Sequence, residues 1–358
     1  MNKKKIIIIG SSPYLIIEAL YNIKKGNSVE IIEEKSFLGG NWCLHNYDNY
    51  ISEGACHILS PPNNKVYCFL KENLGIDMQE QNPQPKIYIY NKHFKKLKHY
   101  NDSKFISILK FFKAIIFSFN TEFKISKHPK KIFKKKLNFQ YPAGGSVELI
   151  SKLSSLLNQN SVKISLNKKV TKINLKSKEV LCQSGNITEP HSFDKVICGF
   201  GISANEIIDS YNNKIGLKFS KKHAKHILIE TGVKKKFDFS YLRIKGSAIF
   251  FRISDVTKFH KPRREGVNLY LLSCNWNYSS EVHIHNIKQL LQSLKLLNNE
   301  NDNIKVIHIS HRWNALLEKE KISKLNNEQF SLVYKPQGKD LNLVEAISQN
   351  VDRWKEVL

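Results

Sequence analysis

Gly10 and Glu33 stand at the two positions of this sequence whose spacing most clearly indicates a chemistry. Gly10 follows a short apolar run, Lys5–Ile9, and opens a turn that leads into a helical stretch. Such a turn presents free backbone N–H groups and the positive end of a helix dipole, which together bind phosphate. Glu33 ends a second apolar run about 20 residues later, where a carboxylate accepts hydrogen bonds from ribose hydroxyls. The pair predicts a dinucleotide site.

The elements that must position these two residues form a strand–helix–strand unit. Lys5–Ile9 is typical of a strand buried in a parallel sheet. Residues 15–23 place apolar side chains on one helical face, and Gly26 ends that helix. Ser28–Ile32 is the second predicted strand. The whole unit has the size of a βαβ motif, which takes about 30 residues.

The glycine turn departs from the usual dinucleotide pattern GxGxxG at two positions. Ser12 stands at the second glycine, where the backbone approaches the pyrophosphate, and Leu15 stands at the third, where the helix packs close to the strand. Pro13 suits the first turn of a helix. Glu34 competes with Glu33 for the ribose. A βαβ unit that binds no ligand and carries a surface glutamate is the simpler alternative.

Residues 6–40 resemble the N-terminal fingerprint of FAD enzymes related to monoamine oxidase, protoporphyrinogen oxidase and phytoene desaturase. That fingerprint is a strand, a glycine turn, a helix, a glycine, a strand ending in glutamate, and a glycine pair. Gly10, Gly26, Glu33 and the pair Gly39–Gly40 occupy these places in order. The ordered set favours a nucleotide site over the simpler alternative.

A second segment, residues 139–201, resembles the central region of the same family. There a YPxGG loop leads into a helix, and a strand passes the adenine side of FAD. Tyr141-Pro142 and Gly144-Gly145 carry the match to the loop, and Val170 stands where the backbone of the family contacts adenine. An ordinary turn followed by a helix is the alternative interpretation.

The resemblance implies that the chain holds FAD in an extended form. The pyrophosphate would lie at residues 10–14 and the adenosine ribose at Glu33. The last predicted helix, Leu341–Trp354, resembles the one whose N-terminus faces the flavin pyrimidine ring. The implied cofactor-binding residues are Gly10, Ser11, Ser12, Pro13, Tyr14, Glu33, Glu34, Gly39, Gly40, Asn41, Trp42, Val170, Asn342 and Leu343.

Few side chains are expected to take part in catalysis, because the isoalloxazine ring itself carries hydride chemistry. His57 is a candidate proton carrier or flavin contact, and a structural histidine is the alternative. Arg252 is a candidate for binding a substrate carboxylate or phosphate. A salt bridge between Arg252 and Asp255 explains that arginine equally well.

Three functions follow from this pattern. The first is an FAD-dependent oxidoreductase of the amine-oxidase and protoporphyrinogen-oxidase-like class that acts on a small-molecule substrate. The second is a non-redox flavoenzyme, because residues 39–41, 54–57 and 341–347 also look like UDP-galactopyranose mutase. The third is a flavin-free relative that only binds a partner, which the two missing glycines motivate.

The expected fold class is α/β. A Rossmann-like FAD-binding domain, with a parallel sheet and flanking helices, is interleaved with an α+β substrate domain. The predicted parts are 1–75 (FAD-binding, first part), 76–140 (substrate or helical subdomain), 141–205 (FAD-binding, second part), 206–335 (substrate domain) and 336–358 (C-terminal flavin-contacting helix).

The net charge of +26 raises the question of a nucleic-acid partner. Only six of the 57 basic residues are arginine, and the lysines are spread through the whole chain. Proteins that read bases and phosphates rely on the planar fork of arginine. The composition therefore favours a general lysine bias, and we expect no nucleic-acid partner.

A cytoplasmic location is expected from the cysteines and from the N-terminus. None of the six cysteines forms a CxxC pair or a zinc pattern with histidine, so neither disulfides nor a metal site is predicted. The apolar run near the N-terminus is too short for a signal peptide. Residues 105–136, amphipathic and then lysine-rich, are a candidate for peripheral contact with anionic lipid on the inner membrane face. A helix packed on the core with a solvated basic loop is the favoured alternative.

Overall fold

The computed structural model of the chain describes most of the expected nucleotide-binding region and parts of the remainder. The described residues are 3–40, 42–45, 51–53, 64–81, 86–91, 96–99, 139–199, 206–209, 211–215, 219–232, 241–245, 249–257, 266–275, 283–294, 296–297, 303–315, 329–332 and 343–358. The segment 105–136 lies outside them, so its contact with lipid stays a prediction. Among the described helices, none combines the length and the apolar character needed to cross a membrane.

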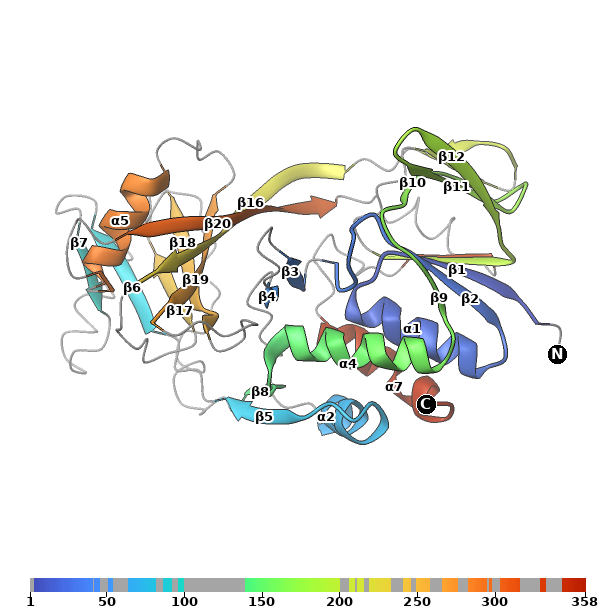
Figure 1. The fold of residues 1–358 in the computed structure, drawn as a ribbon, viewed down its shortest axis with the longest axis horizontal. Helices are drawn as coiled ribbons and strands as arrows, with labels where there is room; N and C mark the ends of the chain where they lie inside the picture. The colour runs from blue at the N-terminus through green and yellow to red at the C-terminus, as the bar shows by residue number, and fades with distance from the viewer. Residues whose placement is uncertain are drawn as a thin grey trace, which may run out of the picture.

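A parallel sheet forms the centre of the half that contains the glycine turn (Figure 1). Its described strands pair in the order β21, β13, β1, β2, β9, and each printed pairing is parallel. Their bounds are Lys5–Ile9 for β1, Ser28–Ile32 for β2, Lys163–Ser165 for β9, Lys195–Cys198 for β13 and Phe330–Leu332 for β21. The two apolar runs found in the sequence are therefore adjacent central strands, and each is buried over four of its five residues.

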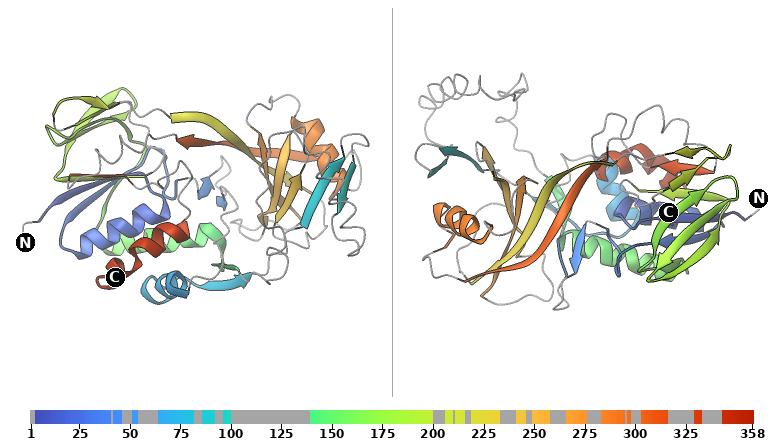
Figure 2. Two further views of the ribbon diagram at one scale, coloured as in Figure 1. Left: turned by 180° about the vertical axis from the view of Figure 1, so that it is seen from behind. Right: turned by 90° about the horizontal axis from the view of Figure 1, so that it is seen from above.

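Three helices cover one face of this sheet. They are α1 (Pro13–Lys24), α4 (Gly145–Gln159) and α7 (Leu343–Lys355), which lie side by side in Figures 1 and 2. Leu15, Ile31 and Leu153 belong to the apolar cluster between these helices and the sheet. Residues far apart in the sequence thus share one core.

A second sheet covers the opposite face of the parallel sheet. Its described strands pair in the order β12, β11, β10, β14, β15. Their bounds are Lys169–Asn174 for β10, Glu179–Ser184 for β11, Ile187–Ser192 for β12, Glu206–Ile208 for β14 and Lys214–Ile215 for β15. Ile7 and Ile32 face this side and share an apolar cluster with Val170 and Val180.

The other half of the molecule is built on a larger sheet at the far end (Figure 2). Its described strands pair in the order β20, β16, β19, β18, β17, β6, β7, and α5 (His283–Ser293) packs on it. The two long strands β16 and β20 reach back toward the half that contains the parallel sheet. The strand bounds are Lys86–Asn91 for β6, Lys96–His99 for β7, Phe219–Thr231 for β16, Tyr241–Lys245 for β17, Phe250–Asp255 for β18, Asn268–Asn275 for β19 and Ile304–Ala315 for β20.

Short elements complete the described part of the chain. The hairpin of β3 (Cys43–His45) and β4 (Ile51–Glu53) lies beside the start of α4. Strand β5 (Met78–Gln81) pairs with β8 (Phe139–Pro142), and α2 (Asn64–Cys68) runs into the π-helical turn Phe69–Asn73. The α/β fold class expected from the sequence is confirmed, whereas the predicted domain boundaries stay a prediction.

Candidate functional site

The turn between β1 and α1 needs glycine at Gly10 for two reasons. Its φ is +95°, a conformation that other residues rarely adopt. A Cβ atom at Gly10 would also lie 3.2 Å from Cδ1 of Leu15. The Gly10 amide donates to the carbonyl of Ile32 at 2.8 Å, so the turn is held against the end of β2.

Leu15, at the third glycine position of the pattern, is accommodated by glycine elsewhere. Its side chain is buried among the residues between the sheet and the helices. A Cβ atom at Gly199, which follows β13, would come within 2.7 Å of Cδ1 of Leu15. The close approach that normally requires a glycine in the helix is therefore provided by glycines at the ends of two strands.

The N-terminus of α1 carries neither a side-chain cap nor an acidic residue in its first turn. The helix begins at Pro13, and Ser12 at the N-cap makes no capping hydrogen bond with its side chain. The first turn contains no acidic residue, and the Ile16 amide is already bonded to the Ser12 carbonyl at 3.0 Å. Pro13 has no N–H, so the amides of Tyr14 and Leu15 are the first-turn donors without a partner within the helix, and such amides can bind phosphate.

Tyr14, the remaining predicted phosphate contact in this turn, directs its ring elsewhere. The ring lies 5.2 Å from that of Trp354 in α7, between centroids. Burial, followed by the nearby Glu18 carboxylate, raises the pKa of Tyr14 well above its ordinary value. A contact between Tyr14 and a ligand in the turn would therefore involve its backbone.

Glu33 faces the glycine turn from the end of β2. Its side chain is only 6% exposed, whereas Glu34 is exposed. The Ser11 hydroxyl donates to Oε2 of Glu33 at 2.5 Å, and the Lys35 amide donates to Oε1 at 3.0 Å. Of the two competing carboxylates, Glu33 is the one that the fold directs toward the glycine turn.

The pair Gly39–Gly40 packs against the same turn. The φ angles of these glycines are +108° and +58°. The Gly39 amide donates to both the hydroxyl and the carbonyl of Ser11, at 3.0 and 3.1 Å. A Cβ atom at Gly39 would meet Ile150 of α4 at 3.1 Å, and one at Gly40 would lie 3.7 Å from the Ser12 amide nitrogen. The pair thus joins the two segments that carried the resemblance.

Lys35 closes the segment between Glu33 and the glycine pair. Its Nζ donates to the carbonyl of Gly40 at 2.7 Å. Burial lowers the pKa of Lys35, while the neighbouring carboxylates of Glu33 and Glu34 act in the opposite direction. The ammonium group therefore links the start of the loop, next to Glu33, to its end at Gly40.

The connection from β9 to β10 passes directly beside Glu33. The Glu33 amide donates to the Ser165 carbonyl at 2.9 Å, and the Lys168 amide donates to the Glu33 carbonyl at 3.0 Å. Val170 follows in β10, where its side chain is buried between the two sheets. Any ligand contact of Val170 would involve its backbone, as the resemblance implies.

Glu53 is part of the site region and was not identified from the sequence. Its side chain is buried, and its Oε1 accepts from the Tyr141 hydroxyl at 2.6 Å and from the Ser146 amide at 2.8 Å. The Ser146 hydroxyl in turn donates to the carbonyl of Trp42 at 2.7 Å. A carboxylate at this place satisfies the Ser146 amide in the first turn of α4. The only signal was a glutamate in a short polar stretch, which is too weak to predict a cap.

The C-terminal helix is fixed to α1 by a buried carboxylate. Glu18 of α1 accepts from Trp354 Nε1 at 3.0 Å and from Arg353 Nη2 at 2.5 Å. Figure 1 shows α1 and α7 running in the same direction, with their N-terminal ends on the same side. Leu343 is the first residue of α7. Asn41, His57 and Asn342 lie outside the described residues.

Arg252, the second candidate for catalysis, lies in β18 of the larger sheet. It is half-buried, and its Nε donates to the Ser254 hydroxyl at 3.2 Å. Oδ1 of Asp255 accepts from both the amide and the hydroxyl of Thr257, at 2.9 and 2.6 Å. Arg252 thus lies in a different sheet from β1 and β2, whose ends are followed by Gly10 and Glu33.

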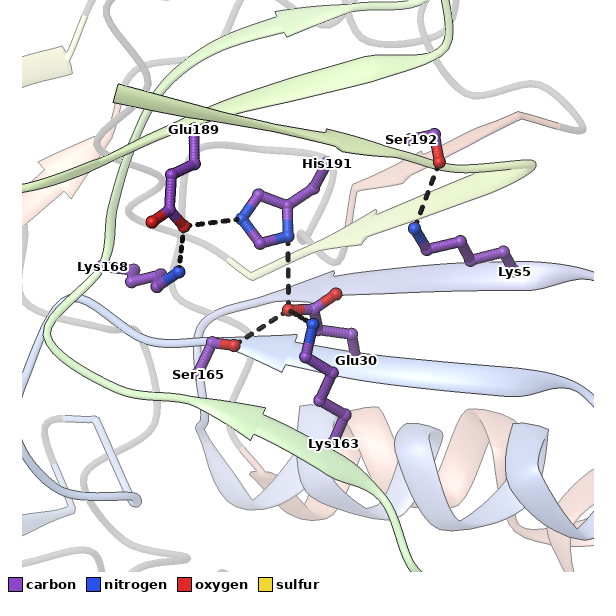
Figure 3. Close-up of polar contacts among 8 residues, drawn as sticks. All are labelled: Lys5, Glu30, Lys163, Ser165, Lys168, Glu189, His191 and Ser192. Carbon is purple, nitrogen blue, oxygen red and sulfur yellow. Dashed lines mark hydrogen bonds and ion pairs between the residues drawn. The ribbon is translucent and has the colours of Figure 1, made fainter. Parts of the chain in front are cut away.

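A second polar group, centred on the buried Glu30 carboxylate, lies between the parallel sheet and β12 (Figure 3). Glu30 of β2 is 3% exposed and accepts from the Ser165 hydroxyl at 2.8 Å. Lys163 Nζ and His191 Nδ1 lie 3.0 and 3.3 Å from the same carboxylate oxygen. Burial alone would raise the pKa of Glu30, but the bonds from Lys163 and Ser165 and the charge of His191 lower it overall.

The outer edge of this polar group is formed by a surface ion pair. Lys168 pairs with Glu189, and His191 Nε2 lies 3.8 Å from that second glutamate. The His191 ring thus stands between two carboxylates, and Nε2 has no hydrogen-bond partner. Among the described residues, no group of three or more potential ligands could hold a metal ion.

Comparison with known proteins establishes the fold. No family model matches the chain, and no curated protein matches it. A solved oxidoreductase of Methanosarcina mazei matches 98% of this chain and 100% of its own, with 16% identity and a TM-score of 0.61. Reduced UDP-galactopyranose mutase matches over 99% and 95%, with 10% identity and a TM-score of 0.67. A putrescine oxidase redesigned at its cofactor site matches over 99% and 98%, with 11% identity and a TM-score of 0.57. These likenesses show that the chain has the fold that these three solved proteins share.

Proposed function

We propose that the chain binds FAD and acts as an FAD-dependent oxidoreductase of the amine-oxidase and protoporphyrinogen-oxidase-like class. One observation carries the proposal. The glycine turn, the buried Glu33 carboxylate and the pair Gly39–Gly40 are hydrogen-bonded into one unit at the N-terminus of α1. The match to solved oxidoreductases over the whole chain supports the same class.

The residues present fit the two ends of an adenosine diphosphate group. The uncapped amides of α1 suit the pyrophosphate. A carboxylate has about four lone-pair sites, and Ser11 and Lys35 occupy two of those on Glu33. One site on each oxygen is left for the ribose hydroxyls. The backbone between β9 and β10, which passes beside Glu33, would border the adenine.

The chain's own residues would bind and orient the cofactor. When bound, the flavin ring supplies the hydride chemistry. The helix amides hold the negative charge of the diphosphate, and Glu33 fixes the sugar. His57 and Arg252 are proposed as the proton carrier and the group that binds a substrate anion. The half that contains the larger sheet would bind the small-molecule substrate.

The binding of FAD is tested first by absorbance of the purified full chain. Oxidised flavin should give bands near ~375 and ~450 nm. Protein that stays colourless after incubation with FAD, and that gives no heat on titration with FAD, would overturn the proposal.

Three glutamate variants then locate the ribose contact. Glu33→Gln should weaken FAD binding about tenfold or more, because a hydrogen bond to a charged acceptor is lost. Glu34→Gln, at an exposed neighbour, should keep the affinity. Glu72→Gln, at an exposed position in the turn after α2, is the control for the loss of one negative charge. The opposite result for the first two variants would assign the ribose to Glu34.

A second candidate function is supported by the match to UDP-galactopyranose mutase over nearly the whole chain. That activity would isomerise a nucleotide sugar with the flavin reduced and without net electron transfer. Incubation with UDP-galactopyranose, with and without dithionite, separates the two activities. Turnover that requires reduced flavin supports the mutase, whereas flavin reduction by a substrate followed by reoxidation supports the oxidoreductase.

A further inference from the structure

The Ser11 side chain lies at the centre of the nucleotide site without facing solvent. It is 1% exposed, and its hydroxyl makes two hydrogen bonds. It donates to Oε2 of Glu33 at 2.5 Å and accepts from the Gly39 amide at 3.0 Å. A hydroxyl has a single proton, and an amide can only donate. The direction of both bonds is therefore fixed, from Gly39 through Ser11 to Glu33.

We propose that Ser11 is a positioning residue that orients the Glu33 carboxylate for the adenosine ribose. This inference rests on the proposed nucleotide-binding function. Ser11 holds one carboxylate oxygen and the Lys35 amide holds the other, so the plane of the carboxylate cannot rotate freely. The remaining lone pair on each oxygen is then presented in a fixed direction, which suits two neighbouring hydroxyls of one sugar.

The same bonds connect the orientation of Glu33 to the glycine pair. Gly39 lies against α4 through Ile150, so the amide that bonds to Ser11 is itself held by packing. Without the Ser11 hydroxyl, only the Lys35 amide would hold the carboxylate. A ligand would then have to immobilise the Glu33 side chain on binding, which lowers affinity.

Removal of this hydroxyl should leave the turn intact. The Gly39 amide also bonds to the backbone carbonyl of Ser11 at 3.1 Å, which a Ser11→Ala variant retains. Alanine removes one buried oxygen atom and adds no bulk. The variant therefore separates the orientation of Glu33 from the shape of the turn. Ser192→Ala, which removes a serine hydroxyl bonded to Lys5 on the far side of the parallel sheet, is the matched control.

The test compares the binding of ADP and of 2′-deoxy-ADP by calorimetry, with thermal unfolding of each variant as a check on folding. Wild-type chain and Ser192→Ala should prefer ADP. In Ser11→Ala the affinity for ADP should fall about fivefold, while that for 2′-deoxy-ADP changes little, so the preference is reduced. Equal weakening of both ligands would overturn the inference, because it indicates a structural role for Ser11.

A thermodynamic cycle provides the second readout. Because Ser11 acts through Glu33, the double variant Ser11→Ala/Glu33→Gln should bind ADP as weakly as Glu33→Gln alone. Additive losses would overturn the inference while leaving the nucleotide site in place. A wild-type chain that binds neither ADP nor FAD would overturn the proposed function and this inference together.

Discussion

The middle and the end of strand β2 hold two buried carboxylates in different ways. Glu30, in the middle, is surrounded by Lys163, His191 and Ser165 in the space between two sheets. Glu33, at the end, receives its hydrogen bonds from a hydroxyl and a backbone amide. The partners of Glu30 include the ammonium group of Lys163, which compensates the charge of the carboxylate. Those of Glu33 orient the carboxylate and leave acceptor sites for a ligand.

This difference teaches that burial alone does not identify a functional carboxylate. A buried charge that is paired and fully hydrogen-bonded contributes to the structure, and removal of one partner is costly. A buried carboxylate at the carboxyl end of a parallel strand lies where ligands of α/β folds bind. The predictions below separate the structural role of Glu30 from the binding role of Glu33.

The largest effect on stability is expected at Glu30. Glu30→Ala leaves His191 and Ser165 without their partner between the sheets. The free energy of unfolding should fall by about 2 kcal/mol or more. Lys163 adds little to this cost, because its side chain is 66% exposed and regains water. Urea unfolding measures the change, and Glu72→Gln serves as the exposed control. A loss no greater than that of the control would show that the group does not stabilise the fold.

The pH dependence of unfolding should show the contribution of Glu30 to stability in the wild-type chain. The folded-state pKa of Glu30 lies below its ordinary value of 4.5, so its contribution to stability is present above that value. As the pH falls below 4.5 toward the lowered pKa, this contribution is lost, because the unfolded chain takes up a proton more readily. Glu30→Gln should therefore show a shallower loss of stability between pH 4.5 and pH ~3 than the wild type. Parallel curves would contradict the assignment.

Gly199 tests how the end of the sheet accommodates Leu15. Gly199→Ala would place a Cβ atom 2.7 Å from Cδ1 of Leu15, which must then move. Because that atom is the end of a side chain, the cost should be only about 1 kcal/mol. Leu15→Ala is destabilising by itself, since it removes buried contacts, but the added cost of Gly199→Ala should vanish in that background. Urea unfolding of the four proteins gives this coupling directly, and additive losses would show that the two sites are independent.

Sequence patterns predicted those features of the fold whose residues lie close together in the chain. The runs that form β1 and β2, the glycine turn and the strand-end Glu33 lie within one βαβ unit, so short-range periodicity and spacing predicted them. Edge strand β12 was not predicted, because its Pro190 and polar residues lack an apolar alternation. An edge position tolerates such a strand, since proline needs no inward ladder partner there.

Long-range contacts account for what the patterns missed. Glu53 bonds to residues 88 and 93 positions later in the chain, and Gly199 accommodates Leu15 from a different strand. Neither contact has a signature in the local sequence. Leu15 departs from the motif at the third-glycine position, but Gly10 and Gly199 leave room for its side chain in the fold. Local motifs therefore indicate where a ligand binds, and the tertiary fold determines which departures from the motif are tolerated.

The smallest effect on the free energy of unfolding is expected at Glu33, in contrast to Glu30 in β2. Glu33→Gln keeps one carbonyl oxygen, which accepts from either the Ser11 hydroxyl or the Lys35 amide, and a neutral amide costs less to bury than a carboxylate. The free energy of unfolding without ligand should change by less than about 1 kcal/mol. The stabilisation that saturating FAD adds to the wild type should shrink markedly in the variant, because it grows with affinity. Thermal unfolding with and without FAD measures both quantities. A variant that loses as much stability as Glu30→Ala, and gains as much from FAD as the wild type, would place Glu33 among the structural carboxylates.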